Sequence, residues 1–383
     1  MGTQTDVTAL LADLVRIDSV NPTLIPGASG EAAIAAFILA WARDAGLEGI
    51  VQEAGPGRPN VIVIARGSGN GRSLMLNGHI DTVGVTEMHT PFSAHIEANK
   101  LYGRGAYDMK GGVAASLIAA TRAKALNLRG DVIVTAVADE EAASIGTQAI
   151  LRDLHRWRPD AVIVTEPTEM ELAVAHKGFI WFDVATFGVA AHGSRPQLGV
   201  DAIAQMGKVL VALAQHDHAL RASPAHPYLG TGSVHASLIH GGQELSSYPA
   251  YCTLQLERRT LPGETADAVQ AQLQAILDQL SRADHTFHAT LTRGLVRDPF
   301  EVSESLPLVQ VCQHQLSEVL RRPATTGGVS FWADSCLFAA AGLPTVLLGP
   351  TGGGAHGTVE WVDVDTVAQC ADVYTAVAQT LCQ

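Results

Sequence analysis

The sequence predicts an α/β protein built on a mixed sheet, and three observations carry that prediction. Short runs of Val, Ile and Leu end in turn residues, helical patterns lie between these runs, and the pattern changes in the middle of the chain. Apolar runs without alternation are typical of strands covered on both faces. Strands that alternate with helices favour an α/β sheet.

Five runs share this strand character: "VIVIARG" (61–67), "LMLNG" (74–78), "VIVTAV" (132–137), "AVIVTEP" (161–167) and "PTVLLGP" (344–350). Helical patterns are predicted between or near them, over 31–46, 111–126 and 305–321. The chain has 383 residues, and two domains are expected because single cores stop growing near about 250–300 residues. The alternation of strands and helices describes the larger of the two.

From residue 179 the pattern predicts a second kind of domain. The elements expected in it are a strand (179–187), a helix (199–216), two strands (232–240 and 250–258), a helix (264–282) and a strand (285–293). This βαββαβ order is that of a ferredoxin-like module. The prediction is a catalytic domain in two parts, 1–178 and 294–383, with an inserted lid domain over 179–293.

Composition restricts the classes of partner. The net charge of −13 argues against a nucleic-acid surface, which needs clustered Lys and Arg, so a small-molecule substrate is expected. No apolar run reaches the ~18 residues of a membrane helix. The N-terminus has no basic segment before an apolar core, which predicts a cytoplasmic protein. The five cysteines contain no C-x-x-C and are odd in number, so neither disulfides nor a thiolate metal site is expected.

Histidines and acids follow four of the predicted strands, at the edge where open α/β sheets bind ligands. They are His79 and Asp81, then Asp139, Glu140 and Glu141, then Glu166, and finally His356 after the glycine-rich "TGGGA". Asp108 lies in a further glycine-rich turn, "LYGRGAYDMKGG". Each feature alone is common on a solvated surface, but unrelated surface residues have no reason to collect at successive strand ends.

Imidazole and carboxylate ligands without thiolates suit two divalent cations, with Zn favoured and Co or Mn as alternatives. Two cations at close range need a shared carboxylate, and Asp108 is the expected bridge. Asp81 is predicted to hold the second imidazole nitrogen of His79. Glu140 and Glu141 point to opposite sides of an extended backbone, so one can bind metal while the other faces the metal-bound water.

Eight segments resemble the M20 metallopeptidase family, which includes acetylornithine deacetylase, succinyl-diaminopimelate desuccinylase, aminoacylase-1 and glutamate carboxypeptidase. They are "GHIDTV", "LYGRGAYDMKGG", "ADEEAASIGT", "VTEPT", "AHKG", "AHGSRP", "RTLPGE" and "GPTGGGAHG". The likeness covers nearly the whole chain in order and spacing.

The resemblance implies a role for each matching residue of the metal centre. His79 and Glu166 would bind one metal, Glu141 and His356 the other, and Asp108 would bridge them. Glu140 would be the general base that activates the metal-bound water. A cis peptide would follow Asp108.

The resemblance also implies a substrate site and a homodimer formed through the lid domain. His192 would stabilise the oxyanion, Arg259 would bind a substrate carboxylate, and Gly353 of the glycine-rich loop would contact the substrate. Family members commonly carry an asparagine where this chain has Ser246 in "GGQELSSYP". A serine offers one donor instead of two, so substrate preference is expected to differ there.

Three functions remain open from the sequence. The preferred one is removal of the acyl group from an N-acyl amino acid, and the alternative within the family is a dipeptidase or carboxypeptidase. The third is a non-catalytic, metal-stabilised binding protein, against which Glu140 argues because a binding module needs no spare acid. The glycine-rich "GPTGGGAHG" lacks the Gly-Lys-Ser/Thr ending of a P-loop, and "GRGAYD" lacks the third glycine of a dinucleotide fingerprint. The sequence contains neither G-x-S-x-G nor H-E-x-x-H.

Overall fold

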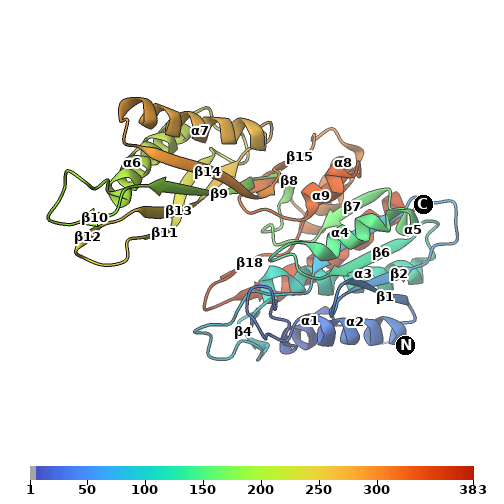
Figure 1. Cartoon of the computed structure of the whole chain (residues 1–383). Coiled ribbons are helices and arrows are strands. Elements are labelled where there is room, and N and C mark those ends of the chain that lie inside the picture. The colour runs from blue at the N-terminus through green and yellow to red at the C-terminus, as the bar shows by residue number, and fades with distance from the viewer. Residues whose placement is uncertain (1–5) are drawn as a thin grey trace. The chain divides into compact units, whose positions relative to one another are not determined.

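The computed structural model describes residues 6–383, whose contacts divide the chain into two compact units (Figure 1). The first comprises Met1–Val174, Val302–Gly327 and Ala333–Gln383, and the second Ala175–Glu301 and Gly328–Trp332. The predicted insertion, 179–293, falls inside the second unit, which begins earlier and ends later. The N-terminal prediction of localisation rests partly on residues 1–5, which lie outside the described residues. Over residues 6–383, no helix combines the length and apolar character needed to cross a membrane.

The first unit is built on a mixed sheet with the strand order β1-β2-β6-β3-β7-β17-β8, and β16 pairs with β8. Its strands are β1 (Glu48–Gly55), β2 (Arg58–Ala65), β3 (Leu74–His79), β6 (Val132–Val137), β7 (Ala161–Val164), β8 (Leu172–His176), β16 (Thr326–Val329) and β17 (Thr345–Leu347). Neighbours in the run β6-β3-β7-β17 are parallel, whereas β1 and β2 are antiparallel to theirs. The predicted mixed α/β fold is confirmed.

Helices flank this sheet: α1 (Val7–Arg16), α2 (Ala32–Asp44), α3 (Gly111–Leu126), α4 (Ile145–Arg152), α5 (Leu154–Trp157), α8 (Pro307–Leu320), α9 (Ser335–Ala340) and α10 (Val364–Leu381). Helix α3 packs against β2, β3, β6 and α10, and its first ten residues are buried. Small residues allow this close packing. A Cβ atom at Gly112 would lie 2.0 Å from the backbone oxygen of Thr165, just beyond β7.

A small antiparallel sheet joins the chain before α3 to the chain after β17. Its order is β18 (Gly352–Gly353), β19 (Trp361–Asp363), β5 (Lys100–Tyr102) and β4 (His95–Glu97). Between β5 and α3, the short helical segment η1 (Ala106–Lys110) contains a cis peptide between Asp108 and Met109. The cis peptide that the family resemblance implies is therefore present.

The second unit has a four-stranded antiparallel sheet in the order β11-β13-β9-β14. Its elements are β9 (Gly178–Phe187), β10 (Ala191–His192), α6 (Ala202–Arg221), β11 (Ser233–Gly241), β12 (Ser247–Tyr248), β13 (Tyr251–Thr260), α7 (Ala266–Ala283), β14 (His288–Arg297) and β15 (Phe300–Glu301). The four main strands and two helices follow the predicted βαββαβ order. Strand β14 runs on to Arg297, beyond the predicted end at 293, so the second unit continues past 293.

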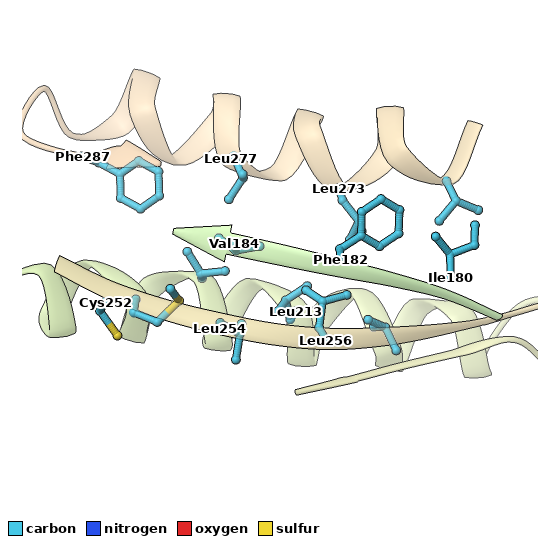
Figure 2. Close-up of a cluster of buried hydrophobic side chains, with 14 of the residues drawn as sticks. Ile180, Phe182, Val184, Leu213, Cys252, Leu254, Leu256, Leu273, Leu277 and Phe287 are labelled. Carbon is cyan, nitrogen blue, oxygen red and sulfur yellow. The ribbon is translucent and has the colours of Figure 1, made fainter. Parts of the chain in front are cut away.

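The core of the second unit follows from simple periodicities (Figure 2). Alternate residues of β9, namely Ile180, Phe182 and Val184, point to one face, and Leu273 and Leu277 of α7 recur at four-residue spacing. All five side chains are buried. Each contributes about 1.5–3 kcal/mol relative to exposure, so this unit has a core of its own.

Candidate metal centre

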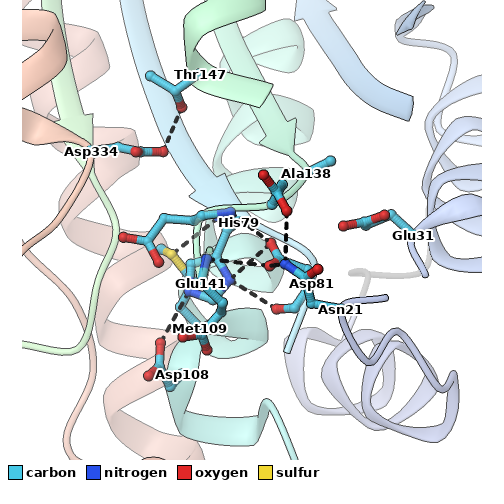
Figure 3. A network of polar contacts seen from close by, with 12 residues as sticks. Asn21, Glu31, His79, Asp81, Asp108, Met109, Ala138, Glu141, Thr147 and Asp334 are labelled. Carbon is cyan, nitrogen blue, oxygen red and sulfur yellow. Dashed lines mark hydrogen bonds and ion pairs between the residues drawn. The ribbon is translucent and has the colours of Figure 1, made fainter. Parts of the chain in front are cut away.

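The site lies where the four parallel strands of the first unit end. His79 is the last residue of β3, Glu140 and Glu141 follow β6, Glu166 follows β7, and the loop after β17 leads to His356. Parallel strands present their carboxyl ends at one edge of a sheet, so their following residues meet there. The structure brings these residues together with Asp108. Figure 3 shows His79, Asp108 and Glu141 of this group, with Asp81 beside them.

Asp108 lies between the two histidines. Its Oδ1 is 3.1 Å from His79 Nε2, and its Oδ2 is 3.3 Å from His356 Nε2. Each oxygen of one carboxylate therefore faces a different imidazole. This is the arrangement expected of a carboxylate shared between two cations.

Two glutamates add one further oxygen to each histidine. Glu166 Oε1 lies 3.8 Å from His79 Nε2, and Glu141 Oε2 lies 3.1 Å from His356 Nε2. The contacts thus pair Glu166 with His79 and Glu141 with His356, and Asp108 contacts both histidines. The metal-ligand roles of these residues stay predictions. Glu140 is also close, because His79, Glu140 and Glu166 each offer a ligand atom within 4.8 Å of the others.

Asp81 is buried beside His79, but its carboxylate does a different task from the predicted one. His79 Nδ1 lies 2.9 Å from the backbone oxygen of Asp81, whereas the nearer carboxylate oxygen is 3.7 Å away. The carboxylate accepts hydrogen bonds from the backbone N–H groups of Glu140 (3.1 Å) and Glu141 (3.3 Å). Asp81 thus fixes the imidazole through its main chain and the two glutamates through its side chain.

A buried network of hydrogen bonds holds the Asp81 carboxylate and the neighbouring Asp139. Asn21 donates to Asp81 at 2.7 Å and to Asp139 at 3.1 Å. Arg58 donates to both oxygens of Glu31, at 2.5 and 2.7 Å, and to Asp139 at 2.9 Å. Charge-assisted, bidentate contacts of this kind restrict geometry strongly, so the strand-end loops are held in fixed positions.

Burial governs the protonation of the acids. It raises the pKa values of Glu140 and Glu166 well above the ordinary value, because each carboxylate lies away from water and near other acids. Burial likewise raises the pKa of Asp81 to about 7. A group of acids in this environment favours the binding of a compensating positive charge.

The histidines supply part of that charge. Hydrogen bonds to Asp108 and Glu141 raise the pKa of His356 to about 10. Burial opposes charge on His79, but the hydrogen bond to Asp108 and the nearby glutamates outweigh it and raise its pKa well above the ordinary value. A divalent cation bound between imidazole and carboxylate would balance the same charges. The donor set of imidazole and carboxylate therefore fits two cations.

The other predicted site residues lie elsewhere in the structure. Gly353 belongs to β18 of the first unit and pairs with Trp361. In the second unit, β10 pairs with β12 and Gly193 N–H donates to Ser246 at 2.7 Å, which brings His192 and Ser246 together. Both are exposed, and Arg259 lies on β13. The substrate roles of these four residues stay predictions.

Sequence reasoning missed the residues that hold the ligand loops. They are Asn21, Glu31, Arg58, Arg104 and Glu360, all buried. Arg104 lies in the segment "LYGRGAYDMKGG", four residues before Asp108, and this proximity could have indicated a role near the metal centre. The other four are single polar residues with no local pattern around them.

A set of imidazoles and carboxylates at parallel strand ends, with His79 and Glu166 buried and His356 exposed, is typical of the metal-dependent hydrolases as a class. The particular family follows from comparison: the model of peptidase family M20/M25/M40 matches residues 75–380, so the chain belongs to that family. The chain is accordingly a metal-dependent hydrolase that acts on amide bonds.

Relatives and solved structures agree with this assignment. Acetylornithine deacetylase from Salmonella arizonae is 29% identical over 382 residues, which cover 96% of each protein. The crystal structure of aminopeptidase PepT from Bacillus cereus has a TM-score of 0.80 at 20% identity, covering 100% of this chain and 99% of that one. The YXEP protein of Bacillus subtilis, described as a dinuclear metal-binding peptidase of the M20 family, has a TM-score of 0.76 at 14% identity and covers 99% and 98%. The two structures establish likeness of fold alone.

Proposed function

We propose that this protein removes the acyl group from an N-acyl amino acid at a centre of two divalent metal ions. The observation that carries the proposal is Asp108, whose two oxygens face His79 at 3.1 Å and His356 at 3.3 Å. The preference for deacylation rests on the acetylornithine deacetylase relative, which matches almost the full length of the chain.

His79 and Glu166 would hold one ion, Glu141 and His356 the other, and Asp108 both. Zn is the favoured metal, with Co and Mn as alternatives. When bound, the ions would polarise the amide carbonyl and lower the pKa of a water. Asp81, through its main chain and its carboxylate, keeps His79 and the two glutamates aligned with that site.

Glu140 would act as the general base. It lies beside His79 and Glu166, and its backbone N–H is fixed by Asp81. Burial raises its pKa well above the ordinary value of a glutamate, which increases its affinity for a proton. Glu140 would accept a proton from the attacking water and deliver it to the nitrogen of the leaving amine.

The second unit would recognise the substrate. Glu257 holds Arg259 Nε at 2.6 Å, and the guanidinium stacks on Phe179 at 5.1 Å from the ring centre. A planar fork held in this way suits a substrate carboxylate. His192 would stabilise the oxyanion, Ser246 would contact the acyl oxygen, and Gly353 of the first unit would line the substrate.

The second candidate is a dipeptidase or carboxypeptidase, which also cleaves an amide and frees an amine. Both reactions need the same chemistry at the metal centre, so the substrate that is cleaved distinguishes them. Amine release by the Zn-loaded or Co-loaded protein, measured on N-acetyl amino acids, N-succinyl amino acids and dipeptides, separates the two. We expect acyl amino acids to be cleaved; cleavage of dipeptides alone would establish the peptidase.

Glu140→Gln should lower turnover by roughly 10²–10⁴-fold, because a positioned general base contributes about that much. It should still bind two metal ions. Glu97→Gln, at an exposed acid on β4, is the matched control and should retain full turnover. Undiminished turnover in Glu140→Gln would refute the role of Glu140, and two bound metals without any turnover by the wild type would favour a binding protein.

We also propose a cytoplasmic homodimer formed through the second unit. Strand β11 is an edge strand of its sheet and exposes Leu238 and Ile239 by 54% and 49%. An exposed apolar edge is an unfavourable surface unless it is covered. Light scattering should give the mass of a dimer, and Leu238→Asp should give a monomer; a monomeric wild type would contradict this part of the proposal.

A further inference from the structure

Glu360 binds the backbone of the turn that carries Asp108. Its Oε1 accepts hydrogen bonds from the N–H groups of Tyr107 and Asp108, each at 3.0 Å, and its Oε2 accepts one from Gly105 at 3.1 Å. The residue is 2% exposed. Three N–H donors of one turn are thus satisfied by a carboxylate that lies 252 residues later in the sequence than Asp108.

Arg104 completes the arrangement. One of its terminal nitrogens donates to Glu360 Oε2 at 2.7 Å, the other to the backbone oxygen of Gly357 at 2.9 Å, and its Nε to that of Gly84 at 3.1 Å. Gly357 follows His356 directly, and Gly84 lies shortly after Asp81. One guanidinium therefore ties the turn of Asp108 to the segment that follows His79 and to the loop that carries His356.

The catalytic scheme gives neither residue a task. Both oxygens of Glu360 face N–H donors, so its carboxylate is directed at the backbone. A buried ion pair alone is also weak evidence for stability, because desolvation of two charges offsets most of their attraction. Another role is indicated, because every side-chain hydrogen bond of the pair outside the ion pair itself ends on a segment that carries a proposed ligand or directly follows one.

We propose that Glu360 and Arg104 are a positioning pair that sets the Asp108 carboxylate between His79 and His356. This inference rests on the proposed two-metal function. Outer partners of this kind alter metal affinity or activity by about 10–100-fold when they are replaced.

Glu360→Gln tests the proposal with almost no change of volume. An amide has one acceptor edge and one donor edge, so in either orientation its NH₂ group faces backbone N–H donors or Arg104. The turn must shift, and the oxygens of Asp108 with it. Glu48→Gln is the matched control, because Glu48 pairs with Arg66 on the exposed edge of the same unit.

The metal-free wild type and both variants would be titrated with Co(II), with calorimetry and the visible absorption of bound Co(II) as readouts. The wild type and Glu48→Gln should bind two equivalents with the same spectrum. Glu360→Gln should bind one equivalent about 10–100-fold more weakly and show an altered spectrum. A purely structural role would lower the melting temperature and leave affinity and spectrum unchanged.

Wild-type affinity and spectrum in Glu360→Gln would overturn the positioning role while leaving the two-metal centre intact. A wild type that binds fewer than two equivalents would overturn the proposed function and this inference with it. If Glu360→Gln does not fold, Arg104→Lys decides. A lysine retains the charge but cannot reach all three acceptors, so the same loss is expected, and unchanged Co(II) binding would overturn the proposal.

Discussion

Asp81 illustrates how much depends on the single atom that makes a contact. The sequence correctly predicted that this residue supports His79, yet the backbone oxygen holds the imidazole and the carboxylate holds the main chain of Glu140 and Glu141. A two-residue spacing places a side chain on the same side of an extended segment. It does not determine whether the backbone oxygen or the carboxylate of Asp81 faces His79 Nδ1. That depends on the loop after β6, whose N–H groups bind the carboxylate.

At the same scale, the protonation of His356 and His79 predicts how metal binding responds to pH. A histidine binds a metal only after its nitrogen has lost its proton. Contacts with Asp108 and Glu141 raise the pKa of His356 to about 10, so the proton is retained at pH 7 and must be displaced. Metal loading at pH 7 should therefore release protons, and apparent affinity should rise as pH increases toward 10 and fall as pH decreases.

Calorimetry of metal loading in two buffers of different ionisation enthalpy measures the number of protons released. His356→Gln should release fewer protons than the wild type. His95→Gln changes an exposed histidine on β4 and should release as many as the wild type. Loading without proton release, or an equal release from His356→Gln, would contradict the assignment of His356 as a ligand.

At the scale of elements, helix α3 is held close to the sheet by Gly112. A Cβ atom there would lie 2.0 Å from the backbone oxygen of Thr165, next to Glu166. Because neither backbone can yield easily, Gly112→Ala should destabilise the protein by about 1–3 kcal/mol, the usual cost of overpacking. It should also weaken metal binding, since α3 starts directly after η1, which carries Asp108.

Chemical denaturation by urea and metal titration measure both effects. Gly207→Ala is the control in helix α6, where an added Cβ meets nothing within 4 Å. Alanine in a helix is more stable than glycine by about 0.5–1 kcal/mol, so the control should raise the midpoint slightly. Equal midpoints for the two variants would show that the close approach of α3 is unimportant.

The positions of the strongly apolar strands were predictable from the sequence, whereas the position of the edge strand β1 was not. The buried runs of β3, β6 and β7 lie at or close to their predicted positions, because strands covered on both faces need continuous apolar residues. Strand β1 has the sequence "EGIVQEAG" and is mostly exposed or half-buried. It pairs only with β2, at the edge of the sheet, and its backbone pairing leaves little trace in composition.

The candidate site likewise contains residues that the sequence predicted and residues that it did not. Its proposed ligands were predictable, because all are His or carboxylate, four follow predicted strands and Asp108 lies in a glycine-rich turn. Glu360 was not, because its partners at Gly105, Tyr107 and Asp108 are more than two hundred residues away and nothing in "TVEWVD" indicates burial. Long-range pairing of single polar residues has no local sequence pattern.

At the scale of the whole molecule, all the proposed metal ligands belong to the first unit. Ligands that bind only the folded state stabilise it by about 4 kcal/mol at a thousand times the dissociation constant. Removal of metal by a chelator should therefore accelerate hydrogen exchange in the ligand-bearing segments 79–84, 105–110, 139–141, 165–168 and 354–360. Exchange in β9 and β13 of the second unit should not change, because that unit has its own core.

Hydrogen exchange read by mass spectrometry locates the effect. Glu140→Gln, which should keep both metals, is the control and should show wild-type protection before chelation. Faster exchange in β9 to the same extent as in residues 105–110 would show that the two units do not respond separately.

The place of β17 in the sheet has a consequence for the order in which the protein can be made. Strand β17 lies between β7 and β8, with Val346 beside Ile163 and Leu347 beside Ala173. During synthesis both neighbours, and the whole of Ala175–Glu301, leave the ribosome before β17 exists. In the nascent chain, β7 and β8 therefore cannot complete their pairing until β17 has been synthesised. His356 and Glu360 leave the ribosome later still. The second unit can fold while the chain is growing, whereas the metal centre can be assembled only when synthesis is almost complete.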